Sequence, residues 1–316
     1  MDGIRGDKLR ALNLPEPACI IDGVLVEGYT VLSAPRKFGK SWMALQMCYA
    51  VAQGGTFLGR KAAKGQAIYL ALEDTLNLTA SRQRQTVTEG GCDENVYIVR
   101  SVDHGIDDGF IEELDGFIER EGIKDLKLVI IDVLAKIDRG IVGRGEDVYH
   151  KDYRVGATLK KWTEKKHVAL IAMTHVAKKK SDDPYDDTMG TGGVTGSADS
   201  LITLRKTGGK SATMSVIGRA LPEIDIKVQL NGGLWETDIE DYQLSPIYRA
   251  VLQAVDETEG EKVTATDLII AYDLEDSAQR VGEYLAKHKD DFKRDGIAVQ
   301  IIRNGNGSNN YRFRRV

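Results

Sequence analysis

The chain has 316 residues, of which 42% are hydrophobic and 29% charged, a composition typical of a globular protein that buries a full core. No apolar run approaches the ~20 residues of a membrane span, and the amino-terminal stretch MDGIRGDKLR contains no apolar signal region. The three cysteines form no CxxC pair. The sequence therefore argues against a membrane protein and a cysteine-based zinc site, and it favours a cytoplasmic location.

The formal net charge of −5 gives no support to a nucleic-acid partner for the chain as a whole, but the charge is unevenly distributed. Residues 287–316 hold eight basic and three acidic side chains, a net charge of +5. A basic end on an acidic protein is typical of a contact with a polyanion.

From Gly28 to Trp235, short apolar runs alternate with amphipathic helical stretches. Near-continuous apolar strands separated by helices indicate a parallel sheet that is covered on both faces. The predicted strands are 29–33, 66–72, 95–99, 126–132 and 167–175, and the predicted helices are 42–53, 109–120 and 148–165.

After Thr195 the pattern changes to strands joined by tight turns, which predicts antiparallel hairpins at the edge of the sheet. A polar linker then leads to Ser245-Pro246, a favourable helix start, and to three predicted helices followed by a β-hairpin. The third of these helices is predicted over residues 277–292. This is the outline of a winged helix. The predicted fold is thus an α/β core over residues 1–240 with a small winged-helix domain over residues 241–316.

The stretch SAPRKFGKSW, residues 33–42, has the Gly-Lys-Ser of a phosphate-binding loop between a strand and a helix. Such a loop normally begins with glycine where this chain has Ala34, but Pro35 biases Ala34 towards an extended conformation that alanine tolerates. A chance Gly-Lys-Ser on a loop is the alternative. We expect ATP to bind at Ala34, Arg36, Lys37, Phe38, Gly39, Lys40, Ser41 and Trp42.

Polar side chains at the ends of three later strands should meet this loop, because the carboxyl ends of parallel strands lie at one edge of a sheet. Asp132, with Ser41, would hold Mg²⁺, unless it only caps the next turn. Glu73 is the candidate base for the attacking water, and a swap of roles with its neighbour Asp74 is the alternative. Asp74 is better placed as a cap of the following helix, which Asp74 or Thr75 can cap. His175 could sense the γ-phosphate or be structural.

These residues resemble the RecA-like ATPases, and within them the RepA/DnaB-type hexameric helicases, in particular the RepA-like ATPases of plasmids, phages and integrated elements. The resemblance covers about residues 28–235 and rests on the motifs APRKFGKSW, GQAIYLALED, LVIID, THVAKKK, GTGGVTGSADSLITLRK and SVIGRALPE.

The resemblance implies a RecA-like core that uses ATP and Mg²⁺, with Lys40 on the phosphates and Glu73 as catalytic base. It also implies that His175 couples the nucleotide state to a DNA-contacting loop. Arg219 best matches the arginine finger that reaches the nucleotide of a neighbouring subunit, with Arg205 as the competing choice.

Two basic groups are candidates for DNA contact. Lys178, Lys179 and Lys180 lie in a glycine-rich stretch and would bind single-stranded DNA in the channel of a ring, unless this is a solvated loop balanced by its four acids. On the terminal hairpin, Tyr311 and Phe313 should pack inward. The hairpin arginines that would then face duplex DNA, unless the unit docks a protein, are Arg303, Arg312 and Arg314.

The sequence therefore predicts an ATP-hydrolysing, DNA-dependent motor, a helicase of mobile-element replication that forms a hexameric ring on single-stranded or forked DNA. One alternative is a nucleotide-switched DNA-binding, helicase-loader or recombination ATPase without unwinding activity. Another is a small-molecule phosphotransferase, but the sequence contains no legible lid or acceptor pocket.

Overall fold

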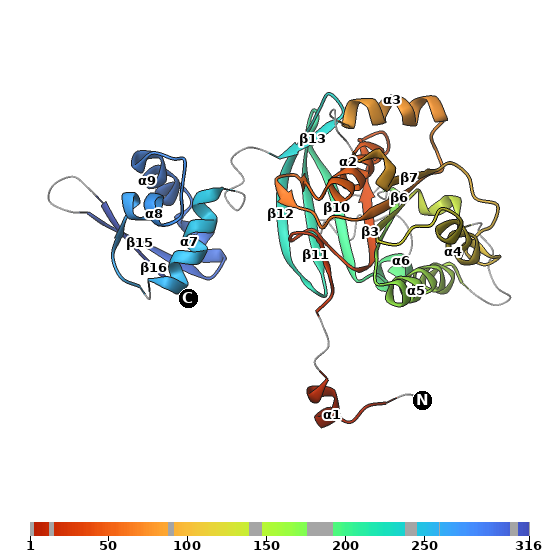
Figure 1. Ribbon diagram of the computed structural model, residues 1–316, viewed down its shortest axis with the longest axis horizontal. Helices are drawn as coiled ribbons and strands as arrows, with labels where there is room; N and C mark the ends of the chain where they lie inside the picture. Colours follow the sequence, from red (N-terminus) through yellow and green to blue (C-terminus); the bar gives the residue numbers. More distant parts are fainter. Residues whose placement is uncertain are drawn as a thin grey trace. The chain divides into compact units, whose positions relative to one another are not determined.

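The computed structural model describes residues 3–12, 16–87, 92–138, 147–175, 192–237, 245–258, 260–303 and 309–315 (Figure 1). The chain divides into two compact units, Met1–Asp238 and Ile239–Val316, and each is described by itself.

The first unit is built on a nine-stranded sheet with the strand order β13-β12-β11-β10-β3-β9-β8-β6-β7. The strands from β10 to β7 pair in parallel, whereas β11, β12 and β13 add antiparallel hairpins beyond β10. The predicted mixed α/β fold, with a mostly parallel sheet and antiparallel hairpins at one edge, is confirmed. The strands are β3 (Gly28–Ala34), β6 (Gln66–Ala71), β7 (Val96–Val99), β8 (Leu126–Asp132), β9 (Ala169–His175), β10 (Ser200–Gly208), β11 (Ser211–Gly218), β12 (Leu221–Asn231) and β13 (Leu234–Thr237).

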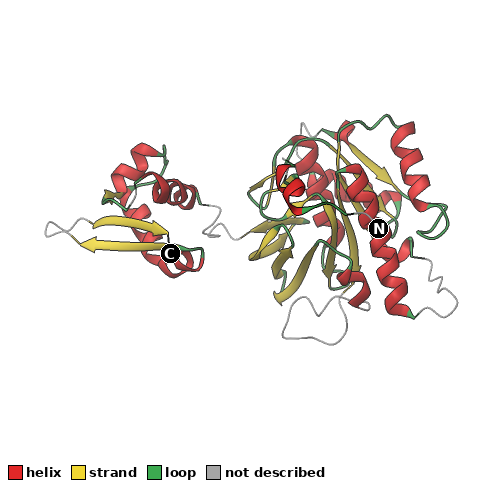
Figure 2. Ribbon diagram, turned by 90° about the horizontal axis from the view of Figure 1, so that it is seen from below, coloured by secondary structure: helices red, strands yellow, loops and turns green. Residues whose placement is uncertain are grey.

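Helices cover both faces of this sheet, as the apolar character of its central strands requires (Figure 2). One face packs against α2, and the other packs against α4 and α5. In β8 the run Leu128 to Ile131 is fully buried because it contributes alternately to the two cores. The helices are α1 (Gly6–Ala11), α2 (Lys40–Gln53), α3 (Leu76–Thr86), α4 (Phe110–Arg120), α5 (Val148–Lys166) and α6 (Gly192–Gly196).

Shorter elements complete this unit, and they are β1 (Cys19–Ile21) paired with β2 (Leu25–Val26), β4 (Thr56–Phe57) paired with β5 (Arg60–Lys61), and the 3₁₀ turns 93–95 and 134–136. Within the described part of the chain, no helix combines the length and apolar character needed to cross a membrane.

The register of the parallel strands aligns their carboxyl ends along one side of the sheet. Ala34 of β3 pairs with His175 of β9, and Ala71 of β6 pairs with Asp132 of β8. The phosphate loop follows Ala34, and Glu73 follows Ala71 by two residues. The sheet thus places the polar residues predicted from the sequence at a common edge.

The second unit combines helices with a three-stranded antiparallel sheet of order β14-β16-β15. Ser245 caps α7, and Thr264 forms a capping box with Asp267 at the start of α8. Its elements are α7 (Pro246–Glu257), β14 (Val263–Thr264), α8 (Ala265–Ala271), α9 (Ala278–Lys287), α10 (Lys289–Arg294), β15 (Ile297–Arg303) and β16 (Asn309–Arg315).

The expectation of a single helix over residues 277–292 is wrong, because the chain breaks between α9 and α10 at His288 (φ −101°, ψ 17°). The His288 ring is buried, contacts Tyr284 at 4.7 Å between ring centroids, and its Nδ1 lies 2.8 Å from Asp291. Tyr311 and Phe313 are buried, as expected for the inward face of the hairpin. The assignment of this unit as a winged helix stays a prediction.

Candidate functional site

The loop between β3 and α2 is shaped to expose backbone N–H groups. Ala34 is the last residue of β3 and is fully buried, so this position adopts the extended conformation that alanine tolerates. Lys37 (φ 57°) and Gly39 (φ 84°) are left-handed, and such turns create concave arrays of N–H groups that bind anions. Gly39 caps α2 without a side-chain hydrogen bond. No side chain therefore caps the first turn of α2.

Lys40 has a buried side chain that folds back on its own loop. Its Nζ donates to the carbonyl oxygens of Ala34 (3.2 Å) and Pro35 (3.3 Å) and lies 2.9 Å from Nδ1 of His175. Burial lowers the pKa of Lys40, while the charges of Asp132 and Glu73 act in the opposite direction. Burial also lowers the pKa of His175, and the Lys40 cation lowers it further. A neutral His175 that accepts from Lys40 at Nδ1 carries its proton on Nε2.

Asp132 is a buried carboxylate at the end of β8, with a side chain next to Tyr69 of β6. The Tyr69 hydroxyl donates to Oδ2 of Asp132 at 2.7 Å. Burial, followed by the charge of Asp132, raises the pKa of Tyr69, and the Ser41 side chain opposes this rise. Hydroxyl and carboxylate oxygens are the ligands that Mg²⁺ prefers, so Ser41 and Asp132 fit the predicted metal site. Among the described residues, no group of three or more His, Cys, Asp and Glu side chains is placed to hold a metal ion.

Glu73 and Asp74 follow β6 but differ in their partners. Glu73 is exposed and, within the described part of the chain, has no hydrogen bond or ion pair. Asp74 forms an ion pair with Arg82 of α3, whose guanidinium lies 5.7 Å from the ring centroid of Trp42. Of the two caps predicted for this helix, Thr75 caps α3, whereas Asp74 is held by Arg82.

A cavity of about 340 Å³ unites these groups. The three strand-end residues predicted from the sequence, Glu73, Asp132 and His175, all line it, whereas Arg36 does not, although its charge acts on Lys40 and His175. The lining residues are Lys37, Phe38, Gly39, Lys40, Ser41, Trp42, Glu73, Asp74, Arg82, Asp132, His175 and Leu230. Sequence reasoning missed Arg82 and Leu230, which lie on a helix and a hairpin without any motif.

Arg219 does not join this cavity. It follows β11, whose Gly218 pairs with Ser200, and Ser200 pairs with Thr30 near the start of β3. The Arg219 side chain is 68% exposed and lies 3.9 Å from Asp199. It lies at the end of the parallel strands that is opposite to the end carrying the phosphate loop. The competing residue, Arg205, lies two positions beyond Thr203, the partner of Ser33, and is therefore at the same edge as the loop.

The predicted DNA-contacting residues are only partly described. Lys178, Lys179 and Lys180 lie outside the described residues. Arg312 and Arg314 occupy one face of β16, opposite Gln300 and Ala298 of β15. Arg303 shares the other face with Val299 and is exposed at the strand end, so the three arginines do not form one surface.

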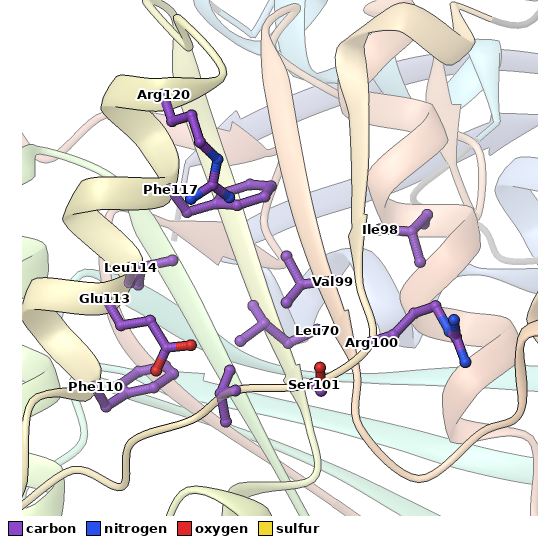
Figure 3. Close-up of a pocket in the computed structure, with 11 residues that line it drawn as sticks. Leu70, Ile98, Val99, Arg100, Ser101, Phe110, Glu113, Leu114, Phe117 and Arg120 are labelled. Atoms are coloured by element: carbon purple, nitrogen blue, oxygen red, sulfur yellow. The ribbon is translucent and has the colours of Figure 1, made fainter.

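A second cavity, of about 310 Å³, lies where the edge strand β7 meets α4 (Figure 3). Leu70 and Val99 face Leu114 and Phe117 of α4, and Arg100 points away from that helix (Figure 3). The one carboxylate here, Glu113, accepts from the backbone N–H groups of residues 103 and 104. None of the site residues predicted from the sequence lines this cavity, so the cavity around Lys40 is the candidate active site.

Residues 5–181 match a protein family described as AAA domain. Among solved structures, one that is titled as an ATPase domain is similar, with a TM-score of 0.50 and 13% sequence identity, over 66% of this chain and 84% of that chain. At this level of identity the likeness concerns the fold alone. No curated protein matches the sequence.

Proposed function

The chain belongs to the AAA domain family and has a RecA-like P-loop core, and from this premise we propose that it hydrolyses ATP in the cavity around Lys40. The observation that carries the proposal is the meeting of Lys40, Glu73, Asp132 and His175 in one cavity at the carboxyl ends of parallel strands. Phosphoryl transfer depends on such positioning and on stabilisation of charge.

The residues divide the work between binding and proton transfer. Lys40 and the N–H groups of residues 36–41 bind the β- and γ-phosphates, for which Lys40 must leave the carbonyl oxygens of Ala34 and Pro35. Ser41 and Asp132 would hold Mg²⁺, which neutralises phosphate charge when bound. Glu73 accepts a proton from the attacking water while the new P–O bond forms and the bond to the ADP oxygen breaks.

We further propose that the protein is a DNA-dependent motor, a RepA-like helicase of mobile-element replication. The support is the resemblance of the motifs over residues 28–235, the lysines 178–180, and the exposed side chains of Arg303 and Arg314 on the terminal hairpin. The same proposal assigns the second unit as a winged-helix domain that contacts DNA. A nucleotide-switched DNA-binding, loader or recombination ATPase without unwinding activity is the alternative, because a switch needs the same cavity.

A strand-displacement assay on a tailed duplex separates these functions. The helicase proposal predicts displacement that requires ATP and that disappears in Lys40→Ala. ATP hydrolysis that is stimulated by DNA without displacement would favour the switch. Failure of the wild-type protein to hydrolyse ATP, with or without DNA, would refute both.

We also propose a ring, a hexamer by the same resemblance, in which Arg219 acts on the nucleotide of a neighbouring subunit. Its position at the opposite edge of the sheet from the cavity supports action between chains rather than within one. Arg219→Ala should bind ATP normally but hydrolyse it poorly. Mixing it with Lys40→Ala should restore part of the activity, because some interfaces then pair an intact site with an intact arginine. An absence of recovery on mixing would contradict the proposal.

A further inference from the structure

The β12–β13 hairpin lies at the outer end of the nine-stranded sheet, yet it contacts the phosphate loop through Trp235. The Trp235 side chain is buried, and its indole Nε1 donates to the carbonyl oxygen of Gly39 at 2.9 Å. Its ring meets Phe38 edge to face, with 5.6 Å between centroids and 69° between planes. Two consecutive residues of the loop, Phe38 and Gly39, therefore both contact Trp235.

Trp235 is itself held by helix α2. Its backbone N–H donates to Oε1 of Gln46 at 2.7 Å, and Nε2 of Gln46 donates to its carbonyl oxygen at 3.1 Å. The Gln46 side-chain amide thus makes the two backbone hydrogen bonds that a neighbouring strand would make to Trp235, and it fixes the backbone of β13 there. Helix α2 therefore holds the backbone of Trp235 through Gln46, and the Trp235 indole in turn holds the phosphate loop that precedes α2.

This connection fixes the orientation of one particular peptide unit. The Gly39 carbonyl accepts from the N–H of Met43 at 3.1 Å as well as from Trp235, so both of its lone pairs are engaged. The peptide unit is planar and trans, so fixing this carbonyl also fixes the Lys40 N–H, which points in the opposite direction, away from Trp235. The Lys40 N–H is one of the groups proposed above to bind phosphate.

Gly39 also shows how closely the hairpin approaches. A Cβ at this position would lie 2.8 Å from Cδ2 of Leu230 and 3.1 Å from the Trp235 ring, and the φ of 84° is itself unfavourable for other residues. Leu230 and Trp235 are cross-strand partners in the hairpin. The hairpin therefore restricts both the conformation and the residue type at the last position of the loop.

We propose that Trp235 is a positioning residue for nucleotide binding: its indole N–H, held in place by Gln46, sets the Gly39–Lys40 peptide in the orientation that presents the Lys40 N–H to phosphate. Trp235 does not touch the nucleotide. The proposal rests on the proposed ATPase function, but the orientation of the loop is testable without nucleotide.

The test compares two conservative substitutions. Trp235→Phe keeps an aromatic ring and removes the N–H. Trp162→Phe is a matched control, because Trp162 is equally buried in the core on the other face of the sheet and its Nε1 donates to Asp115 at the same distance, 2.9 Å. Gln46→Ala is a second test, which releases the backbone of Trp235 and leaves the indole intact.

Hydrogen–deuterium exchange without nucleotide is measured for residues 36–43, which include the Met43 N–H that donates to the Gly39 carbonyl. ATP affinity by calorimetry and the melting temperature are measured for each variant as well. We expect faster exchange in the loop for Trp235→Phe and Gln46→Ala and not for Trp162→Phe. ATP binding should weaken about fivefold, the effect of roughly one net hydrogen bond. The two tryptophan variants should show similar melting temperatures.

Wild-type exchange and affinity in Trp235→Phe would overturn the proposal. Equal changes in Trp235→Phe and Trp162→Phe would also overturn it, because the role of Trp235 would then be structural only. If the wild-type protein binds no ATP, the proposed function fails, and the exchange measurement still decides whether Trp235 orders the loop.

Discussion

Glu73 and Asp74 are adjacent acids with different surroundings, and this difference assigns their roles in the proposed reaction. Glu73 lines the cavity, and its charge acts on both Lys40 and His175. Asp74 is held by Arg82, and their side chains are only 13% and 17% exposed. The carboxylate that is free to accept a proton is therefore Glu73. We predict that Glu73→Gln and Asp74→Asn fail in different ways.

Glu73→Gln keeps the shape of the side chain but removes its ability to accept a proton. Loss of a general base costs about 10²- to 10⁴-fold in turnover, or roughly 3–5 kcal/mol in the activation barrier. ATP should bind as well as before or slightly more tightly, because one negative charge facing the phosphates is removed. Asp74→Asn instead weakens a largely buried ion pair worth about 1–3 kcal/mol. In a unit of this size that loss lowers the melting temperature by roughly 2–10 °C.

Single-turnover hydrolysis, ATP binding by calorimetry and thermal unfolding distinguish these outcomes. The assignment requires Glu73→Gln to lose at least about 100-fold in the hydrolysis rate with an unchanged melting temperature. Asp74→Asn should lose stability and remain within about tenfold of the wild-type rate. Wild-type turnover in Glu73→Gln, together with a 100-fold loss and unchanged stability in Asp74→Asn, would transfer the role of base to Asp74.

Three further predictions concern the same cavity. Lys40→Ala should weaken ATP binding about 10- to 100-fold through the loss of charge-assisted hydrogen bonds, whereas Lys161→Ala, at an exposed position on α5, should bind normally in the same titration. Because the pKa of His175 lies below its ordinary value of 6.5, the unfolded chain binds more protons, and stability should fall as pH falls from 6.5 to below the folded pKa. Urea unfolding should show a smaller decrease for His175→Asn, and an identical decrease would contradict the shift. Removal of residues 241–316 should leave basal ATP hydrolysis intact because every residue that lines the cavity belongs to the first unit, and loss of hydrolysis by a folded truncated protein would contradict this.

The convergence of Glu73, Asp132 and His175 in the cavity could be predicted from the sequence because it depends on one property of the fold. Continuous apolar strands indicate a parallel sheet, and a parallel sheet brings the residues after its strands to one edge. Asp132 and His175 end their strands, and Glu73 follows β6 by two residues, so their convergence required no knowledge of contacts between distant side chains.

Trp235 and Leu230 could not be predicted in the same way. The hydrogen bond between Trp235 and Gly39 joins residues 196 positions apart, and it forms only because the outer hairpin of the sheet lies over the loop. Nothing in the local sequence pattern of β12 or β13 indicates that the hairpin lies over the phosphate loop. A buried tryptophan in a hairpin is consistent with ordinary core packing, which Trp235 also provides.

The local errors have a related cause. Asp74 and Thr75 are both good helix caps, and the structure selects Thr75 because Asp74 is engaged with Arg82, eight residues further along the chain. The apolar pattern over residues 277–292 is compatible with one helix, yet the buried ring of His288, next to Tyr284 and Asp291, lies at a break. In both cases tertiary contacts chose between local signals of similar strength.

Lys40 is held in two different ways, and the difference predicts how the cavity responds to nucleotide. Its backbone N–H is fixed through the Gly39 carbonyl, whereas its ammonium group rests on neutral acceptors, and no described carboxylate lies within ion-pair distance of it. Phosphate, as an anion, should therefore displace the side chain without rearranging the loop.

The movement of Lys40 away from His175 removes one cause of the lowered pKa of that histidine, and phosphate adds negative charge nearby. The pKa of His175 should therefore rise when ATP binds. An NMR titration of the His175 ring with and without a non-hydrolysable ATP analogue would measure this change, with His175→Asn identifying the signal. An unchanged pKa in the bound state would mean that Lys40 remains on His175, and the phosphates would then have to be held by the backbone of the loop alone.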